Sequence, residues 1–152
     1  MNLTADTIKP VEGLHAYMPN RPQLHNVVAD EALVAGDVVK QNTAQTDPLR
    51  VHVKKALATD TPFGVVVYDC RKVANAEGDR VAIAQTGDVI YMVAGGAITA
   101  GAKLQFVANT RKVDDTAIEK NAYIGRALTP ATADGDIIQV ELDMTLGVQP
   151  QA

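Results

Sequence analysis

The residues of this chain that could support chemistry are three histidines, one cysteine and several aspartates that follow glycine. His15, His25 and His52 are far apart and form no HxH or HExxH pair, the spacings that bring two imidazoles to one metal ion. Cys70 has no second cysteine for a disulfide or a CxxC zinc pair. As a nucleophile it would need a histidine base and an orienting group. We therefore expect no catalytic residue, no cofactor and no metal, and interpret Cys70 as a small buried hydrophobe.

A glycine, usually followed by aspartate and an apolar run, occurs in four short stretches. A phosphate loop would need GxxxxGK[ST] or GxGxxG opening a helix, whereas these glycines precede alternating, strand-like segments. A calcium loop needs several closely spaced oxygen ligands, and these stretches hold too few. Their uneven spacing excludes a solenoid. We interpret each as a turn in which glycine adopts a positive φ before a strand begins. The stretches are VAGDVV (34–39), AEGDRV (76–81), TAGAKL (99–104) and ADGDIIQV (133–140).

Length and charge restrict the possible partners. The chain has 152 residues, which suggests one domain. Its formal net charge is −4, whereas a surface that holds nucleic-acid phosphates usually needs a basic face. No apolar run approaches the ~18 residues of a spanning helix, and no apolar segment after Met1 is typical of a signal peptide. Serine is absent, which removes the serine hydrolases. We expect neither nucleic acid nor membrane as partner, and a protein that is made and used in a reducing cytoplasm or assembled there into something larger.

Valine-rich alternating segments separated by turn residues predict an all-β fold with antiparallel pairing. The continuously apolar FGVVVYD at 63–69 is typical of a central strand covered on both faces. Tight hairpins are predicted at 85–88 and 108–111. Only 114–122 has the composition for one or two short helical turns. The predicted strands cover residues 27–29, 37–41, 49–55, 63–69, 80–85, 88–94, 103–108, 111–114, 123–128 and 136–144.

Residues 1–26 differ from the rest of the chain. They contain three prolines and show no helical or strand period, so we expect an extended arm before a β-rich domain at 27–146 and a tail at 147–152. A floppy terminus is the alternative, but the segment is too apolar for a purely solvated tail. We therefore favour an arm that becomes ordered against a partner. Its apolar residues are Leu14, Tyr17, Met18 and Leu24.

The order of the signals from Gly36 to Leu142 resembles that of a known family. AGDVV is followed by FGVVVYD, then EGDRVAIAQTGDVIYMVAGGAITAGAKLQFVANTRKVD, then YIGRALTPATADGDIIQVEL. This order resembles the capsid decoration (cement, head-stabilisation) proteins of tailed bacteriophages, and is similar in character to the lambda-type head decoration protein. The resemblance implies a small β-barrel or β-tulip-like domain without enzymatic activity. It also implies a homotrimer on the outer capsid surface of the virion that staples neighbouring major capsid proteins.

The resemblance further implies that the arm contacts the major capsid protein, and Leu14, Tyr17, Met18 and Leu24 are the predicted capsid-binding residues. Strand addition would give such a contact its affinity through backbone hydrogen bonds. A carbohydrate- or receptor-binding β-module on a virion or cell surface is the alternative, although four Tyr, two Phe and no Trp leave few aromatic platforms. A β-barrel enzyme ranks third, because its site would need a deep pocket with convergent carboxylates.

Overall fold

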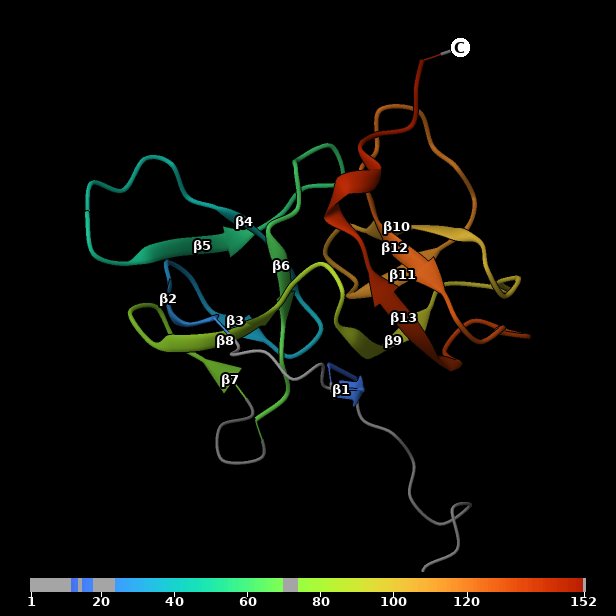
Figure 1. The fold of residues 1–152 in the computed structure, drawn as a ribbon, viewed down its shortest axis with the longest axis horizontal. Helices are drawn as coiled ribbons and strands as arrows, with labels where there is room; N and C mark the ends of the chain where they lie inside the picture. The colour runs from blue at the N-terminus through green and yellow to red at the C-terminus, as the bar shows by residue number, and fades with distance from the viewer. Residues whose placement is uncertain (1–11, 14, 18–23, 70–73, 152) are drawn as a thin grey trace, which may run out of the picture.

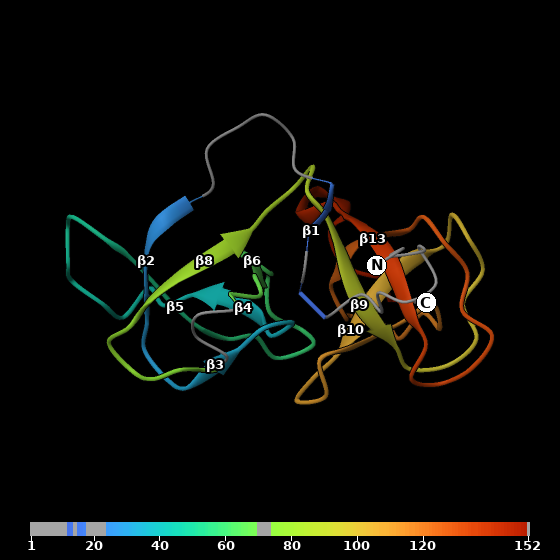
Figure 2. The same ribbon diagram turned by 90° about the horizontal axis from the view of Figure 1, so that it is seen from below.

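Short strands fold this chain into two small closed barrels that lie side by side (Figures 1 and 2). The computed structural model describes residues 12–13, 15–17, 24–69 and 74–151. The N-terminal barrel consists of β2 (Leu24–Ala29), β4 (Val38–Gln41), β5 (Val51–Lys55), β6 (Gly64–Val66) and β8 (Arg80–Ala84). The C-terminal barrel consists of β9 (Val89–Ala94), β10 (Lys103–Val107), β11 (Lys112–Asp114), β12 (Tyr123–Ala127) and β13 (Ile137–Leu142). The remaining elements are β1 (His15–Tyr17), β3 (Leu33–Val34), β7 (Ala74–Asn75) and the 3-10 helix η2 (Met144–Leu146).

The predicted all-β fold is confirmed, and every stretch expected to form a strand contains one. Val65 and Val66 of β6 are buried, as a strand covered on both faces requires. The short helical turn lies at η2, whereas the stretch 114–122 begins with the last residue of β11 and continues as a loop. Two pairings are parallel, β2 with β5 and β11 with β9, which side-chain alternation alone does not reveal. In the described part of the chain, no helix has the length and hydropathy to cross a membrane.

The glycines that precede strands are turn residues, as predicted. Gly36, Gly78, Gly101 and Gly135 all have φ between +86° and +91°, a region that disfavours side chains with a Cβ. The aspartate after the glycine also holds the turn. Asp136 Oδ2 accepts the backbone N–H groups of Thr132 (2.8 Å) and Ala133 (3.0 Å). These two bonds lower the pKa of the Asp136 carboxyl.

The stretch TAGAKL lacks the aspartate, and another part of the chain supplies the missing carboxylate. Asp115 Oδ2 accepts the backbone N–H of Thr99 at 3.2 Å. The backbone bond of the turn is kept, because the N–H of Ala102 donates to the Thr99 carbonyl at 3.1 Å. The carboxylate therefore belongs to the turn, and no ligand is needed to explain it.

The turn at 85–88 corrects one prediction. Gly87 has a φ of 94°, so the turn exists, but the strands on its two sides do not pair. β8 pairs with β2 and β6, whereas β9 pairs with β1, β11 and β13. The turn is therefore the crossing between the barrels and not a hairpin. The hairpin predicted at 108–111 is confirmed, since β10 pairs with β11 in antiparallel fashion.

The two barrels have the same strand order. In each, the first strand pairs in parallel with the third, and the other four pairings are antiparallel: third with second, second with fourth, fourth with fifth, and fifth with first. Residues 26–41 align without gaps on 91–106, which places Gly36 on Gly101. The chain is therefore an internal duplication of one five-stranded barrel.

The duplication extends to the register of the strands. Ala29 is opposite Val53 in the N-terminal barrel, as Ala94 is opposite Val113 in the C-terminal barrel. The other equivalent pairs include Val39–Gly64 with Leu104–Gly125, Val65–Ala84 with Arg126–Glu141, Val27–Val81 with Met92–Ile138, and Lys40–Lys54 with Gln105–Asp114. Positions compared between the barrels below are equivalent in this sense.

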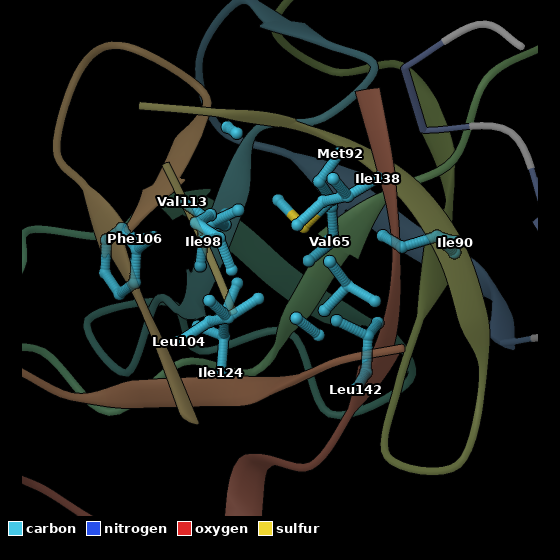
Figure 3. Packing of buried hydrophobic residues seen from close by; sticks show 14 of the residues in the cluster. Val65, Ile90, Met92, Ile98, Leu104, Phe106, Val113, Ile124, Ile138 and Leu142 are labelled. Carbon is cyan, nitrogen blue, oxygen red and sulfur yellow. The ribbon is translucent and has the colours of Figure 1, made fainter. Parts of the chain in front are cut away.

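The hydrophobic core of the C-terminal barrel includes side chains from its neighbour. Val38, Val65 and Ala84 point outward from the N-terminal barrel and join the cluster formed by the C-terminal barrel. Figure 3 shows Val65 among residues such as Ile138 and Leu142. The interior of the N-terminal barrel forms a separate cluster. The barrels are therefore joined by burial of apolar surface as well as by the chain connection.

Candidate functional site

The predicted capsid-binding residues belong to the segment that precedes the N-terminal barrel. Leu14 and Met18 lie outside the described residues, as does Cys70. Tyr17 is the last residue of β1, and Leu24 is the first of β2, where its backbone pairs with Ile83. The part of this segment that the structure describes before β2, residues 12–13 and 15–17, is named the strap below.

The strap crosses the junction between the two barrels. The Gly13 N–H donates to the Tyr91 carbonyl in β9 at 2.8 Å, and the Gly13 carbonyl accepts the N–H of Tyr68, just after β6, at 3.0 Å. Figure 2 shows β1 between the barrels. Gly13 therefore links the first strand of one barrel to the fourth strand of the other.

Two glycines allow this close approach. A Cβ on Gly13 would lie 3.0 Å from the Val66 carbonyl oxygen and 3.0 Å from the Gly36 nitrogen, and its φ of +76° also favours glycine. A Cβ on Gly36 would lie 2.6 Å from Oε1 of Glu12. The same Gly36 that forms the turn before β4 thus leaves room for the Glu12 side chain.

Glu12 is a charged residue of the strap that lies at the junction between the two barrels. Its Oε2 lies 3.4 Å from Nη1 of Arg111, in the β10–β11 hairpin. Its Oε1 is buried, and no described residue hydrogen-bonds to it. Burial raises the pKa of the Glu12 carboxyl, Arg111 opposes this shift, and the nearby Asp37 adds to it. Glu12 therefore pairs with the β10–β11 hairpin of the C-terminal barrel and packs against the Gly36 turn of the N-terminal barrel.

β1 presents a strand edge. It pairs in antiparallel fashion with β9, with His15 opposite Ile90 and Tyr17 opposite Val89. Among the described strands, β1 has a neighbour on one side only. A strand edge of this kind offers unpaired backbone groups to a segment of another protein.

His52 is the centre of the polar cluster that most resembles a chemical site. Nδ1 of His52 lies 2.7 Å from Asp30 Oδ1, and Nε2 lies 3.3 Å from Asp47 Oδ2. Asp47 also accepts the N–H of Leu49 and the Nε–H of Arg50. The two carboxylates leave the His52 side chain only 12% exposed.

The cluster holds the loop between β4 and β5. Hydrogen bonds to Asp30 and then Asp47 raise the pKa of His52, while bonds from the Leu49 N–H and His52 lower the pKa of Asp47 to about 2. No serine or cysteine nucleophile takes part, and among the described residues no group of histidine, cysteine and carboxylate side chains fits a metal ion. The bonds of Asp47 to Leu49, Arg50 and His52 tie this loop to the start of β5.

Sequence reasoning missed the residues that fix the strap. Arg111 lies in the hairpin predicted at 108–111, and Glu12 and Gly13 lie in the predicted arm, but no sequence pattern indicates that these segments meet. Gly13 is the local signal that the sequence offers, because glycine marks a turn or loop in which the chain can adopt a positive φ. The partners of these residues lie far along the chain, so the contact depends on the packing of the two barrels.

Comparison with known proteins agrees with this architecture. Residues 20–142 match the model of a family described as phage cement protein. No curated protein matches the chain. Among solved structures, the head fiber gp8.5 N base of bacteriophage phi29 has a similar fold, with a TM-score of 0.55 and 16% sequence identity over 83% of this chain and 95% of that one. At this identity the likeness shows the fold alone.

Proposed function

The chain belongs to the phage cement protein family, and from this premise we propose that it binds the outer surface of a phage capsid as a homotrimer and staples neighbouring major capsid proteins. Membership gives it a structural, non-enzymatic role in the phage head. The shared fold with a bacteriophage head fiber base supports an association with the head. The outer-surface location, the trimer and the stapling are the proposal.

The observation that carries the proposal is the anchored strap. Glu12 and Gly13 fix one point of the N-terminal segment between the two barrels, and β1 presents an edge beside it. We propose that residues 1–26 act as an arm whose last three residues begin β2, that 27–146 form the decoration domain and that 147–152 form a tail. We further propose that Leu14, Tyr17, Met18 and Leu24 contact the major capsid protein. An anchored arm loses less conformational entropy on binding than a free one, so more of its contact energy becomes affinity.

The rival reading as a carbohydrate-binding module gains no support. Such sites present exposed aromatic rings, but Phe106 and Tyr123 are buried and the other described aromatic side chains, Phe63, Tyr68 and Tyr91, are half-buried.

Co-sedimentation with undecorated heads of the phage that encodes the chain tests the proposal. We expect the wild type to bind in a saturable manner, and a variant lacking residues 2–11 and carrying Leu14→Asp and Met18→Asp to lose most of its binding. This variant keeps Glu12, Gly13 and β1, so it spares the contacts that join the barrels. Leu49→Ala, which truncates an exposed residue in the β4–β5 loop, is the control. If the arm variant occupies the heads fully, the arm is not the capsid-binding segment. If the wild type does not bind, the proposed function is wrong.

A further inference from the structure

Each barrel carries a groove at the same place on its surface. In both, the groove lies between the second and third strands and the connection that leads to the fourth. The groove of the N-terminal barrel has a volume of about 460 Å³ and is lined by residues 40–44, 54 and 60–63. The groove of the C-terminal barrel has a volume of about 370 Å³ and is lined by residues 58, 105–108, 114, 116, 118 and 121. The grooves therefore belong to the structural repeat, with Ala58 of the β5–β6 connection added to the second.

Equivalent residues hold the loop beside each groove by different bonds. Lys40 Nζ lies 2.6 Å from Asp60 Oδ2 in the N-terminal barrel. Gln105, at the position equivalent to Lys40, donates from Nε2 to the carbonyls of Ile118 (3.0 Å) and Asn121 (3.3 Å). Both grooves therefore have a fixed wall, formed in one by an ion pair and in the other by amide hydrogen bonds.

The two grooves differ in charge. Lys54 is opposite Lys40 in the N-terminal barrel, whereas Asp114 is opposite Gln105 in the C-terminal barrel. Like charges on directly opposite residues of a sheet destabilise it. The single carboxylate of Asp60 interacts with both lysines, so one positive charge stays uncompensated among the three. The N-terminal groove is thus left basic, and the C-terminal groove acidic, at equivalent positions.

One ridge separates the grooves. The β5–β6 connection contributes residues 60–63 to the N-terminal groove and Ala58 to the C-terminal groove, and the Ala58 carbonyl accepts the Ala122 N–H at 2.8 Å. Leu57 on this ridge is 57% exposed, and Ile118 and Val107 in the C-terminal groove are 56% and 40% exposed. Large apolar side chains exposed together mark an interaction surface.

We propose that the two grooves are complementary halves of a contact between copies of this chain, with the basic flank of one copy against the acidic and apolar flank of the next. The ridge with Leu57 would then face the symmetry axis. Flanks on two sides of one ridge form a head-to-tail contact, and such a contact closes into a ring of three copies when it rotates each copy by a third of a turn. The inference rests on the proposed homotrimer and names the surface that forms it.

The experiment exchanges the equivalent residues Lys54 and Asp114. Light scattering coupled to size-exclusion chromatography then measures the oligomeric state of the full chain. We expect a trimer for the wild type. Lys54→Asp and Asp114→Lys each place like charges in the contact, so each should raise the concentration for half-assembly by about tenfold or more. The double variant restores opposite charges and should recover most of the assembly. Each substitution introduces the residue type that the other barrel carries at that position, so folding should survive, as circular dichroism would check.

Asp114 also accepts the Thr116 N–H at 2.9 Å, so Asp114→Asn is the matched control that keeps the acceptor while removing the charge. It should weaken assembly less than Asp114→Lys. Trimers in both single variants, no recovery in the double variant, or a wild type that stays monomeric at the highest concentration reached would overturn the inference. Head binding is a separate measurement: a trimer that fails to bind heads would refute the proposed function and leave this contact intact.

Discussion

The N-terminal and C-terminal barrels share one strand order and one register, yet their equivalent outer faces differ completely. The face of the N-terminal barrel is apolar and buried against its neighbour, whereas that of the C-terminal barrel is charged and exposed. The equivalent residues are Val38 with Lys103, Val65 with Arg126, and Ala84 with Glu141. The backbone of a small barrel can therefore be duplicated unchanged, while a few side chains decide whether another barrel packs on it. The charges on the C-terminal barrel prevent the same packing from being repeated without limit.

The most sensitive test of this comparison exchanges one equivalent pair. Val65→Arg should destabilise the chain by about 4 kcal/mol or more or prevent folding, because it buries an unpaired charge in the shared core. Arg126→Val should change stability by no more than about 0.5 kcal/mol, since the position is exposed. Urea denaturation would measure both. Similar losses in the two variants would show that the outer faces do not differ as described.

A second test concerns a feature that the barrels share. A Cβ on Gly64 would lie 2.5 Å from the Ala84 carbonyl oxygen, and one on Gly125 would lie 2.1 Å from the Glu141 carbonyl oxygen. We expect Gly64→Ala and Gly125→Ala to cost about 1–3 kcal/mol each, because the fourth and fifth strands would be forced apart. Gly96→Ala, where a Cβ meets nothing within 4 Å, is the control. If only one of the two strand variants is destabilised, the duplicated packing is not equivalent.

The smallest expected effect lies in a loop where the barrels differ. His52 is equivalent to Lys112, which pairs with Asp134. Because hydrogen bonds to Asp30 and Asp47 raise the folded-state pKa of His52 above 6.5, its contribution to stability is full below pH 6.5 and is lost as pH rises through the folded pKa. The difference in melting temperature between wild type and His52→Asn should therefore shrink as the pH rises. A difference that does not change with pH would contradict the role of the two carboxylates.

The strands were predictable because alternation and turn chemistry are local. The burial of Ile138, Val140 and Leu142 against exposed Glu141 follows the sequence pattern directly. The positive φ at Gly36 and Gly101 also follows, since each glycine lies where a turn precedes a strand.

The duplication was harder to recognise, because the four turn stretches are of two kinds. Those at Gly36 and Gly101 open the second strand of each barrel, and those at Gly78 and Gly135 open the fifth. The β4–β5 loop is longer than the β10–β11 hairpin, and the connection from β6 to β8, which contains β7, is longer than that from β12 to β13. The spacing from Gly36 to Gly78 is therefore larger than that from Gly101 to Gly135. Closure into two barrels depends on pairings between distant strands, which no local pattern encodes.

The strap could not be predicted for a similar reason. Its bonds from Gly13 to Tyr91 and Tyr68 join positions that become neighbours only after both barrels have formed. The expectation of an arm rested on prolines and apolar content, which indicate an extended segment but not where it is anchored.

The central claim is that this chain stabilises a phage head, and the temperature at which filled heads release their DNA tests it most directly. Heads prepared without the chain would be heated alone, with saturating wild-type protein, and with the variant lacking residues 2–11 and carrying Leu14→Asp and Met18→Asp. The account predicts that the wild type raises the release temperature and that the variant does not. An unchanged release temperature with wild-type protein at saturation would contradict it.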